Sequence, residues 1–140
     1  MLLIKRLYEV FVYYIPYMIL KNQLQDLCKA KLIIEGVEVF FEKVPHKNSW
    51  IIKADIHFTC EEMGPGFIEA IESLDFVTIQ RCKAHLKAKP KAGYVSLIKE
   101  SSSIRSFAEF KESMKVFMEL FDFWKSVVDD LVKSRGILVF

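Results

Sequence analysis

The residues best suited to chemistry form two histidine–cysteine pairs, His57 with Cys60 and Cys82 with His85. Imidazole and thiolate groups together are typical ligands of tetrahedral zinc. Both pairs fall in segments that we expect to be extended, where side chains three positions apart point to opposite faces of a strand. Because neither pair then converges on one ion, we expect buried cysteines, outward histidines and no metal site.

A run of basic residues between positions 81 and 91 is the second candidate. Cations at alternate positions of a strand would form one strip that attracts an anionic group. The run contains no aromatic side chains, which single-stranded nucleic-acid binders use to stack bases. We therefore favour a solvated strand face that discourages edge-to-edge aggregation, and we expect no nucleic-acid partner. The cations are Arg81, Lys83, Lys87, Lys89 and Lys91, in one row with His85.

Signals for catalysis are weak. Carboxylate pairs such as Glu61 with Glu62 have nothing that places them in a pocket, and no Ser–His–Asp order or phosphate-binding glycine loop occurs. The thiols of Cys28, Cys60 and Cys82 lack a C-x-x-C motif, so no redox mechanism is indicated. We favour a protein that is not an enzyme, and we assign no catalytic residue and no cofactor.

Composition favours a folded domain that spans residues 1–140. The chain is 52% hydrophobic and 14% aromatic, which excludes disorder as its main state. A formal net charge of +2 is too small for a protein that coats DNA. An odd number of cysteines at irregular spacing favours a reducing compartment, so we expect a cytoplasmic protein.

The N-terminal segment, residues 7–20, is apolar apart from Glu9. It is too short to cross a hydrocarbon core of about 30 Å as a helix, and it lacks a small-residue cleavage site, so we expect a core element and no membrane span. The aromatic and β-branched residues of Leu7–Ile15 predict a first strand that ends at Pro16. Apolar residues at steps of three and four then predict a short helix over residues 16–29.

Between residues 31 and 100 the apolar period changes to two, which is typical of antiparallel strands. Trp50–Cys60 is the clearest of them, with one apolar row facing a core. The preceding run, Leu32–Val44, is expected to bend or bulge at Gly36 and to form one hairpin with Trp50–Cys60.

Further strands are expected after the breaker at Gly64–Gly66. Phe76–Ala88 is predicted to be a long strand with a bulge near Gln80 and Arg81, because its apolar row changes frame there. Tyr94–Lys99 is predicted to be the last long strand. The stretch Phe67–Ser73 fits a short strand and one turn of helix equally, so both stay open.

A long C-terminal helix is predicted by apolar residues at steps of three and four. Ser106 and Glu109 form a capping-box pattern at its start, and Gly136 offers a left-handed cap at its end. The apolar stripe consists of Phe107, Phe110, Met114, Phe117, Phe121, Trp124, Val128 and Leu131.

The predicted element order resembles the helix-grip fold of the START and Bet v 1-like superfamily. The resemblance implies an α+β fold in which a curved antiparallel sheet packs around a long C-terminal helix, with a cavity for lipids, sterols or other hydrophobic molecules. This chain departs from the family pattern because it has one short helix near the N-terminus where the family has two.

We therefore expect non-enzymatic binding or transport of a hydrophobic, lipid-like small molecule between the sheet and the C-terminal helix. Arg81 and Lys83 at the rim would steer an acidic head-group. The alternative is a protein-interaction or assembly module, a homodimer formed through the C-terminal helix and a terminal strand, Ile137–Phe140. The predicted ligand-binding residues are Trp50, Ile52, Ile56, Phe58, Phe110, Met114, Phe117, Phe121 and Trp124.

Overall fold

A computed structural model describes residues 2–26, 28–58, 65–76, 78–79, 83–102 and 104–133. The helices are α1 (Leu2–Glu9), α2 (Ile15–Asp26), α3 (Pro65–Glu72) and α4 (Phe107–Lys133), and a π-helical segment, η1 (Val10–Tyr14), joins α1 to α2. Short 3-10 segments are η2 (Ser73–Phe76) and η4 (Pro90–Ala92). The strands are β1 (Lys29–Ile34), β2 (Val37–Lys43), β3 (Ser49–His57), β4 (Thr78–Ile79), β5 (Ala84–Lys89) and β6 (Tyr94–Ser102).

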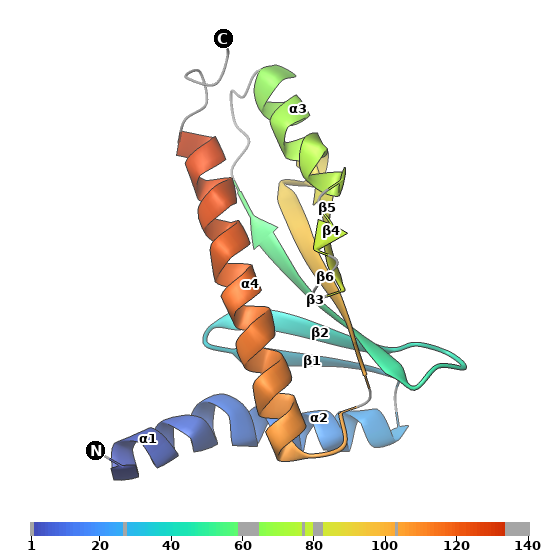
Figure 1. Ribbon diagram of the computed structural model, residues 1–140, viewed down its shortest axis with the longest axis vertical. Helices are drawn as coiled ribbons and strands as arrows, with labels where there is room; N and C mark the ends of the chain where they lie inside the picture. The colour runs from blue at the N-terminus through green and yellow to red at the C-terminus, as the bar shows by residue number, and fades with distance from the viewer. Residues whose placement is uncertain are drawn as a thin grey trace. The chain divides into compact units, whose positions relative to one another are not determined.

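The chain has the predicted α+β fold, with an antiparallel sheet, a helix near the N-terminus and a long C-terminal helix (Figure 1). The strands of the described residues form one sheet in the order β1-β2-β3-β6-β5-β4. Contacts divide the chain into unit 1, Met1–Lys53 with Glu100–Phe117, and unit 2, Ala54–Lys99 with Met118–Phe140. A single domain over residues 1–140 stays a prediction.

The prediction of a strand over Leu7–Ile15 is wrong, because this segment is helical and continues into α2. Pro16 has no N–H to donate, and in an α-helix its ring would crowd the carbonyl four residues earlier. The backbone widens into a π turn just before this proline, where the N–H of Ile15 donates to the carbonyl of Val10. This wider turn lets the helix pass the proline without ending.

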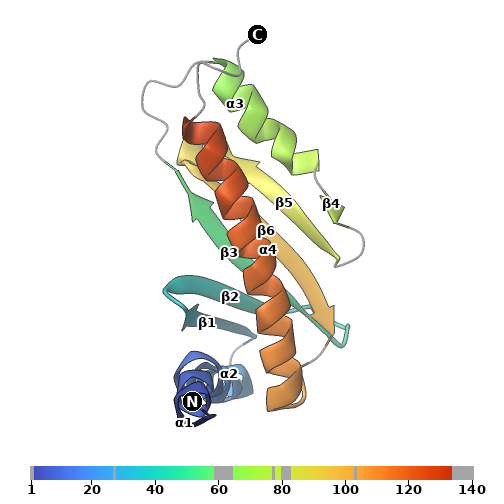
Figure 2. The ribbon, with the colours of Figure 1, turned by 60° about the vertical axis from the view of Figure 1, so that its left-hand side comes forward.

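Burial in unit 1 explains why the helix forms despite the strand-forming residues. Tyr13, Tyr17 and Leu20 recur at steps of four and three and are 6%, 8% and 3% exposed. They form one side of the helix, and α2 lies next to β1 (Figures 1 and 2). A helical period therefore buries these side chains together, whereas an extended segment would separate them.

The turn at Gly36 is sharper than expected. Leu32–Val44 does not continue as one bent strand, because Glu35 and Gly36 have φ angles of +51° and +81° and reverse the chain between β1 and β2. Two residues with positive φ are typical of a type I′ hairpin turn. β2 then pairs with β3, so one predicted hairpin is in fact a three-stranded meander.

Strand β3 confirms the predicted alternation, since Ile52, Ala54 and Ile56 are 0–1% exposed. In unit 2, every residue of β5 pairs with a residue of β6, and the two-residue strand β4 pairs with the other side of β5 (Figure 2). The segment left open between strand and helix is helix α3. The predicted long strand Phe76–Ala88 is divided into β4 and β5, and the bulge predicted near Gln80 and Arg81 lies outside the described residues.

Helix α4 confirms the predicted C-terminal helix and its capping box. The Glu109 amide donates to Ser106 Oγ over 3.2 Å, and the Glu109 carboxylate accepts from the Arg105 amide over 2.9 Å. Phe110, Met114, Phe117, Phe121 and Val128 are at most 4% exposed, so the predicted stripe is core. The predicted cap at Gly136 lies outside the described residues.

The turn at Gly36 gives a direct test of this hairpin. Gly36→Val should lower the free energy of unfolding by about 1–2 kcal/mol, because a β-branched residue resists a positive φ angle. Gly36→Asn should lose clearly less, since Asn tolerates the left-handed region. Urea denaturation of the three proteins measures both effects. Equal stability of wild type and Gly36→Val would contradict the assigned turn.

Candidate functional site

Six of the nine positions predicted to bind a ligand are buried. Ile52, Ile56, Phe110, Met114 and Phe117 are 0–1% exposed, and Phe121 is 4% exposed. In unit 1, the Phe110 ring contacts the rings of Tyr17 and Phe41. Trp50, Phe58 and Trp124 are half-buried. In unit 2, the Phe58 ring meets Phe67 edge to face at 5.6 Å.

One of the two predicted rim residues belongs to the described part of the chain. Lys83 is exposed in a turn before β5, with a φ angle of +51°. Arg81 lies outside the described residues, as do Cys60 and Cys82 of the histidine–cysteine pairs. Within the described part of the chain, no group of three or more potential metal ligands comes together.

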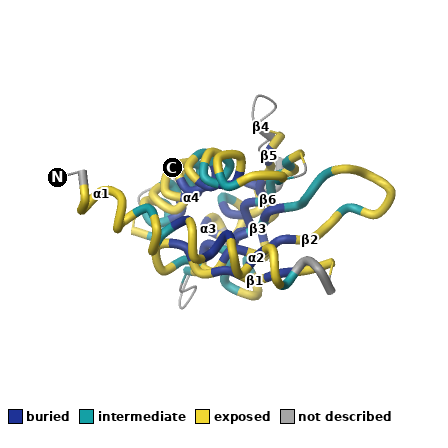
Figure 3. The backbone as a smooth tube through the Cα atoms, turned by 90° about the horizontal axis from the view of Figure 1, so that it is seen from below, coloured by how far each residue is buried: buried dark blue, intermediate teal, exposed yellow. Residues whose placement is uncertain are grey.

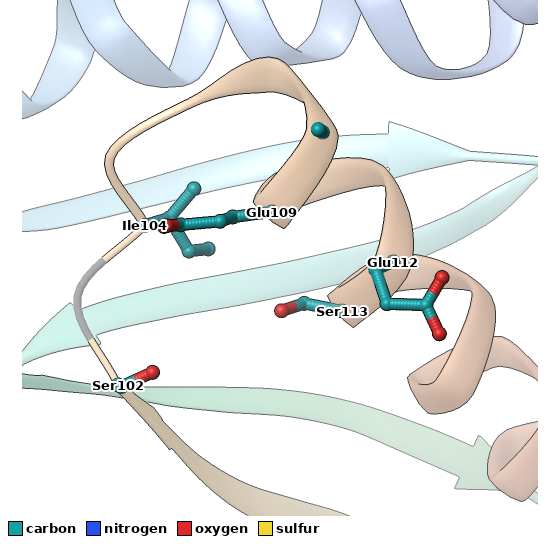
Figure 4. Close-up of a pocket in the computed structure, with 6 residues that line it drawn as sticks. Ser102, Ile104, Glu109, Glu112 and Ser113 are labelled. Atoms are coloured by element: carbon teal, nitrogen blue, oxygen red, sulfur yellow. The ribbon is translucent and has the colours of Figure 1, made fainter.

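A pocket of about 370 Å³ lies in unit 1, where the chain passes from β6 to α4 (Figure 4). Ile104 and Glu109 lie side by side in it. The Glu109 carboxylate is already engaged by the helix cap, so the pocket holds no obvious acid–base pair. We assign no chemistry to it. Its lining consists of Ser102, Ile104, Ala108, Glu109, Glu112 and Ser113.

The most unusual surface of unit 1 is the uncovered side of the N-terminal helix. Large apolar side chains project from it into solvent, with Leu3 and Ile4 each 70% exposed and Phe11 68% exposed. Residues 3–8 of α1 are all exposed (Figure 3). We call this surface the N-terminal apolar face, and it consists of Leu3, Ile4, Leu7, Tyr8, Val10, Phe11, Tyr14, Ile15, Met18 and Ile19.

The spacing along this face is regular. Leu3, Leu7, Phe11, Tyr14 and Met18 follow one another at steps of four, four, three and four, so they form one stripe on a helix. Between residues 3 and 19, the only exposed charged side chains belong to residues 5 and 6, on the other side of the helix. A contiguous apolar surface without charges is typical of an interaction site.

Polar contacts hold the N-terminal helix on unit 1. Lys111 Nζ of α4 and Glu9 Oε1 lie 2.6 Å apart in a half-buried ion pair at the start of the π segment. The Tyr8 hydroxyl donates to Glu35 Oε1 over 2.7 Å, in the turn between β1 and β2. The Tyr14 ring meets Phe107 edge to face at 5.3 Å. The face is therefore presented by a helix that is fixed at several points.

Two ionisable groups respond to these contacts. The hydrogen bond from Lys111 holds the pKa of the Glu9 carboxyl below its usual value of 4.5, and the charges of Lys115 and Lys5 act in the same direction. The hydrogen bond to Glu35 raises the pKa of the Tyr8 hydroxyl above 10.0. At neutral pH the Glu9 carboxyl is therefore ionised and the Tyr8 hydroxyl is protonated, as the two contacts require.

Comparison with known proteins identifies the fold but no family. No protein-family description and no curated protein matches the chain. A chain in the crystal structure of the ExsC–ExsE complex is similar, with 17% identity, a TM-score of 0.54, and coverage of 71% of this chain and 75% of that one. A chain of the heterodimeric ExoU–SpcU complex from the type III secretion system of Pseudomonas aeruginosa gives 16% identity, a TM-score of 0.48, and coverage of 76% and 84%.

The prediction of a carrier for a lipid-like molecule is wrong. The fold resembles a chain that was solved in a complex of two proteins, and the core positions assigned to the ligand pack against other side chains. The α+β arrangement that suggested a helix-grip protein is present, but the helix-grip family is not established by it. Among the described residues, no helix is both long enough and apolar enough to cross a membrane.

The sequence contained a signal for the surface that was missed. Apolar residues from position 2 to position 20 recur at steps of three and four on two sides of a helix, while the high content of aromatic and β-branched residues favoured a strand. The helical spacing of the apolar residues is the better guide here than their strand-forming types, because the burial of Tyr13 and Tyr17 decides the local structure. The lone acid in the run, Glu9, marks the point where the helix meets α4.

The Glu9–Lys111 pair predicts a pH-dependent stability. Because the pKa of Glu9 is lower in the folded state, the pair stabilises the fold above about pH 4.5, and this contribution is lost as pH falls through the folded-state pKa. Glu9→Gln should therefore melt below wild type at neutral pH and should lose less stability between about pH 5 and about pH 3. Thermal melts by circular dichroism across this range measure the difference.

Glu112→Gln is the matched control, since this exposed carboxylate of α4 has no ion pair within the described residues. It should keep the wild-type dependence of melting temperature on pH. Parallel curves for wild type and Glu9→Gln would show that the ion pair does not stabilise unit 1.

Proposed function

We propose that the protein is a protein-interaction module that holds a segment of a partner polypeptide on the N-terminal apolar face. The observation that carries the proposal is a helix that buries Tyr13, Tyr17 and Leu20 on one side and exposes a stripe of large apolar side chains on another. Such helices are normally buried on both sides, so the uncovered side calls for a partner. The specific form that we propose is a secretion chaperone, which would keep one client segment bound and soluble.

The fold supports this proposal, since the ExsC–ExsE structure contains a chain of the same fold in a complex between two proteins. The shape of the face indicates the form of its client. A stripe at steps of three and four accepts an amphipathic helix or an apolar strand of a partner, whose side chains fill the spaces between Leu7, Phe11 and Met18. The homodimer predicted through α4 and Ile137–Phe140 stays a prediction, and that terminal segment lies outside the described residues.

A photo-crosslinking amino acid at position 11 would find the partner. In cells of the native host, the probe in place of Phe11 should form an adduct with one protein. The same probe in place of Phe123, which is 58% exposed in unit 2, should not form that adduct. An adduct with a second copy of this chain alone would contradict a separate partner, and no protein adduct at all would contradict the proposal.

The complex is then rebuilt from the two purified proteins and measured by calorimetry. Leu7→Glu with Phe11→Glu should weaken binding at least about a hundredfold, because each buried apolar side chain is worth about 1.5–3 kcal/mol. Both positions are exposed, so the variant should keep the wild-type melting temperature. Ile68→Glu with Phe123→Glu places the same charges at exposed apolar positions of unit 2 and should bind like wild type.

A further inference from the structure

A second surface in unit 2 carries positive charge that the fold itself does not use. His85, Lys87 and Lys89 alternate with buried residues along β5 and are all exposed. Lys83 and Lys91 are exposed in the turns at the two ends of this strand. We call these five residues the basic row.

On the paired strand β6, no carboxylate lies opposite the lysines of the row. In β6, the residue opposite Lys87 is Ser96 and the residue opposite Lys89 is Tyr94, so neither lysine faces a carboxylate on its paired strand. Asp55 of β3 accepts a hydrogen bond from Ser96 Oγ over 2.6 Å. Glu72 of α3 lines a pocket together with Lys89 and Lys91, but no ion pair joins it to either lysine. No member of the row forms an ion pair with a described residue.

Unit 1 shows the contrasting case on the outward side of its own hairpin. There Lys29 Nζ and Glu42 Oε1 of the paired strand lie 3.9 Å apart, and Lys31 Nζ and Glu38 Oε1 lie 3.8 Å apart. Among the described residues, the alternate lysines of β1 are thus paired with carboxylates, whereas those of β5 are not. Like charges held near one another repel, so the row does not add to the stability of the fold.

We propose that the basic row binds an acidic segment of a partner protein in an extended conformation. Successive lysines on the strand are about 6.8 Å apart, which is the separation of carboxylates at alternate positions of an extended peptide. Charge complementarity with a partner would compensate the repulsion within the row. The surface is distinct from the N-terminal apolar face, so this inference holds or fails independently of the proposed function.

An acidic peptide fits the row better than a nucleic acid. Single-stranded nucleic acids are bound through basic grooves with several aromatic platforms. Here the aromatic ring on the paired strand, Tyr94, packs at 5.8 Å from His57. The whole chain has a formal charge of only +2, which gives little general attraction to a phosphate backbone.

Fluorescence anisotropy with the full-length protein tests the inference. The probe is a labelled peptide in which Glu alternates with Thr, and the comparison probes are the same peptide with Gln for Glu and an oligothymidylate of equal charge. The Glu peptide should bind saturably, more weakly at higher salt, and at least about tenfold more tightly than either comparison probe. Tighter binding of the oligothymidylate, or equal binding of the Gln peptide, would overturn the proposal.

Charge-neutralising variants locate the binding. Lys87→Gln with Lys89→Gln should weaken binding of the Glu peptide about tenfold and leave the melting temperature unchanged or slightly higher. Lys29→Gln with Lys31→Gln removes two lysines of the same spacing from the same sheet and should keep the wild-type affinity. Equal losses in the two variants would mean general attraction to positive charge and would overturn a dedicated site.

Discussion

The contact of Tyr13, Tyr17 and Leu20 with the core of unit 1 decides which side of the N-terminal helix meets solvent. A helix with apolar residues on two sides can bury only one of them against a sheet. Once these three residues are buried, the side that carries Leu3 and Phe11 is left without cover. The presence of an uncovered apolar surface is therefore a consequence of core packing, and the proposed function depends on it.

Pro16 lies within this helix, and the π segment before it allows Tyr13 and Tyr17 to be buried on the same side. An α-helix would place the ring of Pro16 against a carbonyl, and a break would separate α1 from α2. The wider turn is closed by the hydrogen bond from the Ile15 amide to the Val10 carbonyl. It lets the chain continue as a helix from α1 into α2. The ion pair of Glu9 with Lys111 then fixes the helix at the same point.

The buried aromatic rings direct attention to the surface of the molecule. Rings that suggested the walls of a cavity pack against one another, as Phe110 does with Phe41 and Tyr17. The described residues offer two surfaces of different chemistry, one apolar in unit 1 and one cationic on β5 in unit 2. Surfaces of different chemistry suit different segments of a partner, because apolar burial supplies affinity while charge supplies specificity and rate.

The sequence by itself determined the C-terminal helix, its cap at Ser106, the alternation of β3 and the α+β class, because each depends on periodicity or on local hydrogen bonds. The tertiary structure decided the state of residues 7–15 and the filling of the core. Aromatic and β-branched residues are compatible with a strand or a buried helix, and only their partners choose between them. Whether large rings enclose a space or fill it depends on side-chain packing across elements distant in sequence, which no local pattern records.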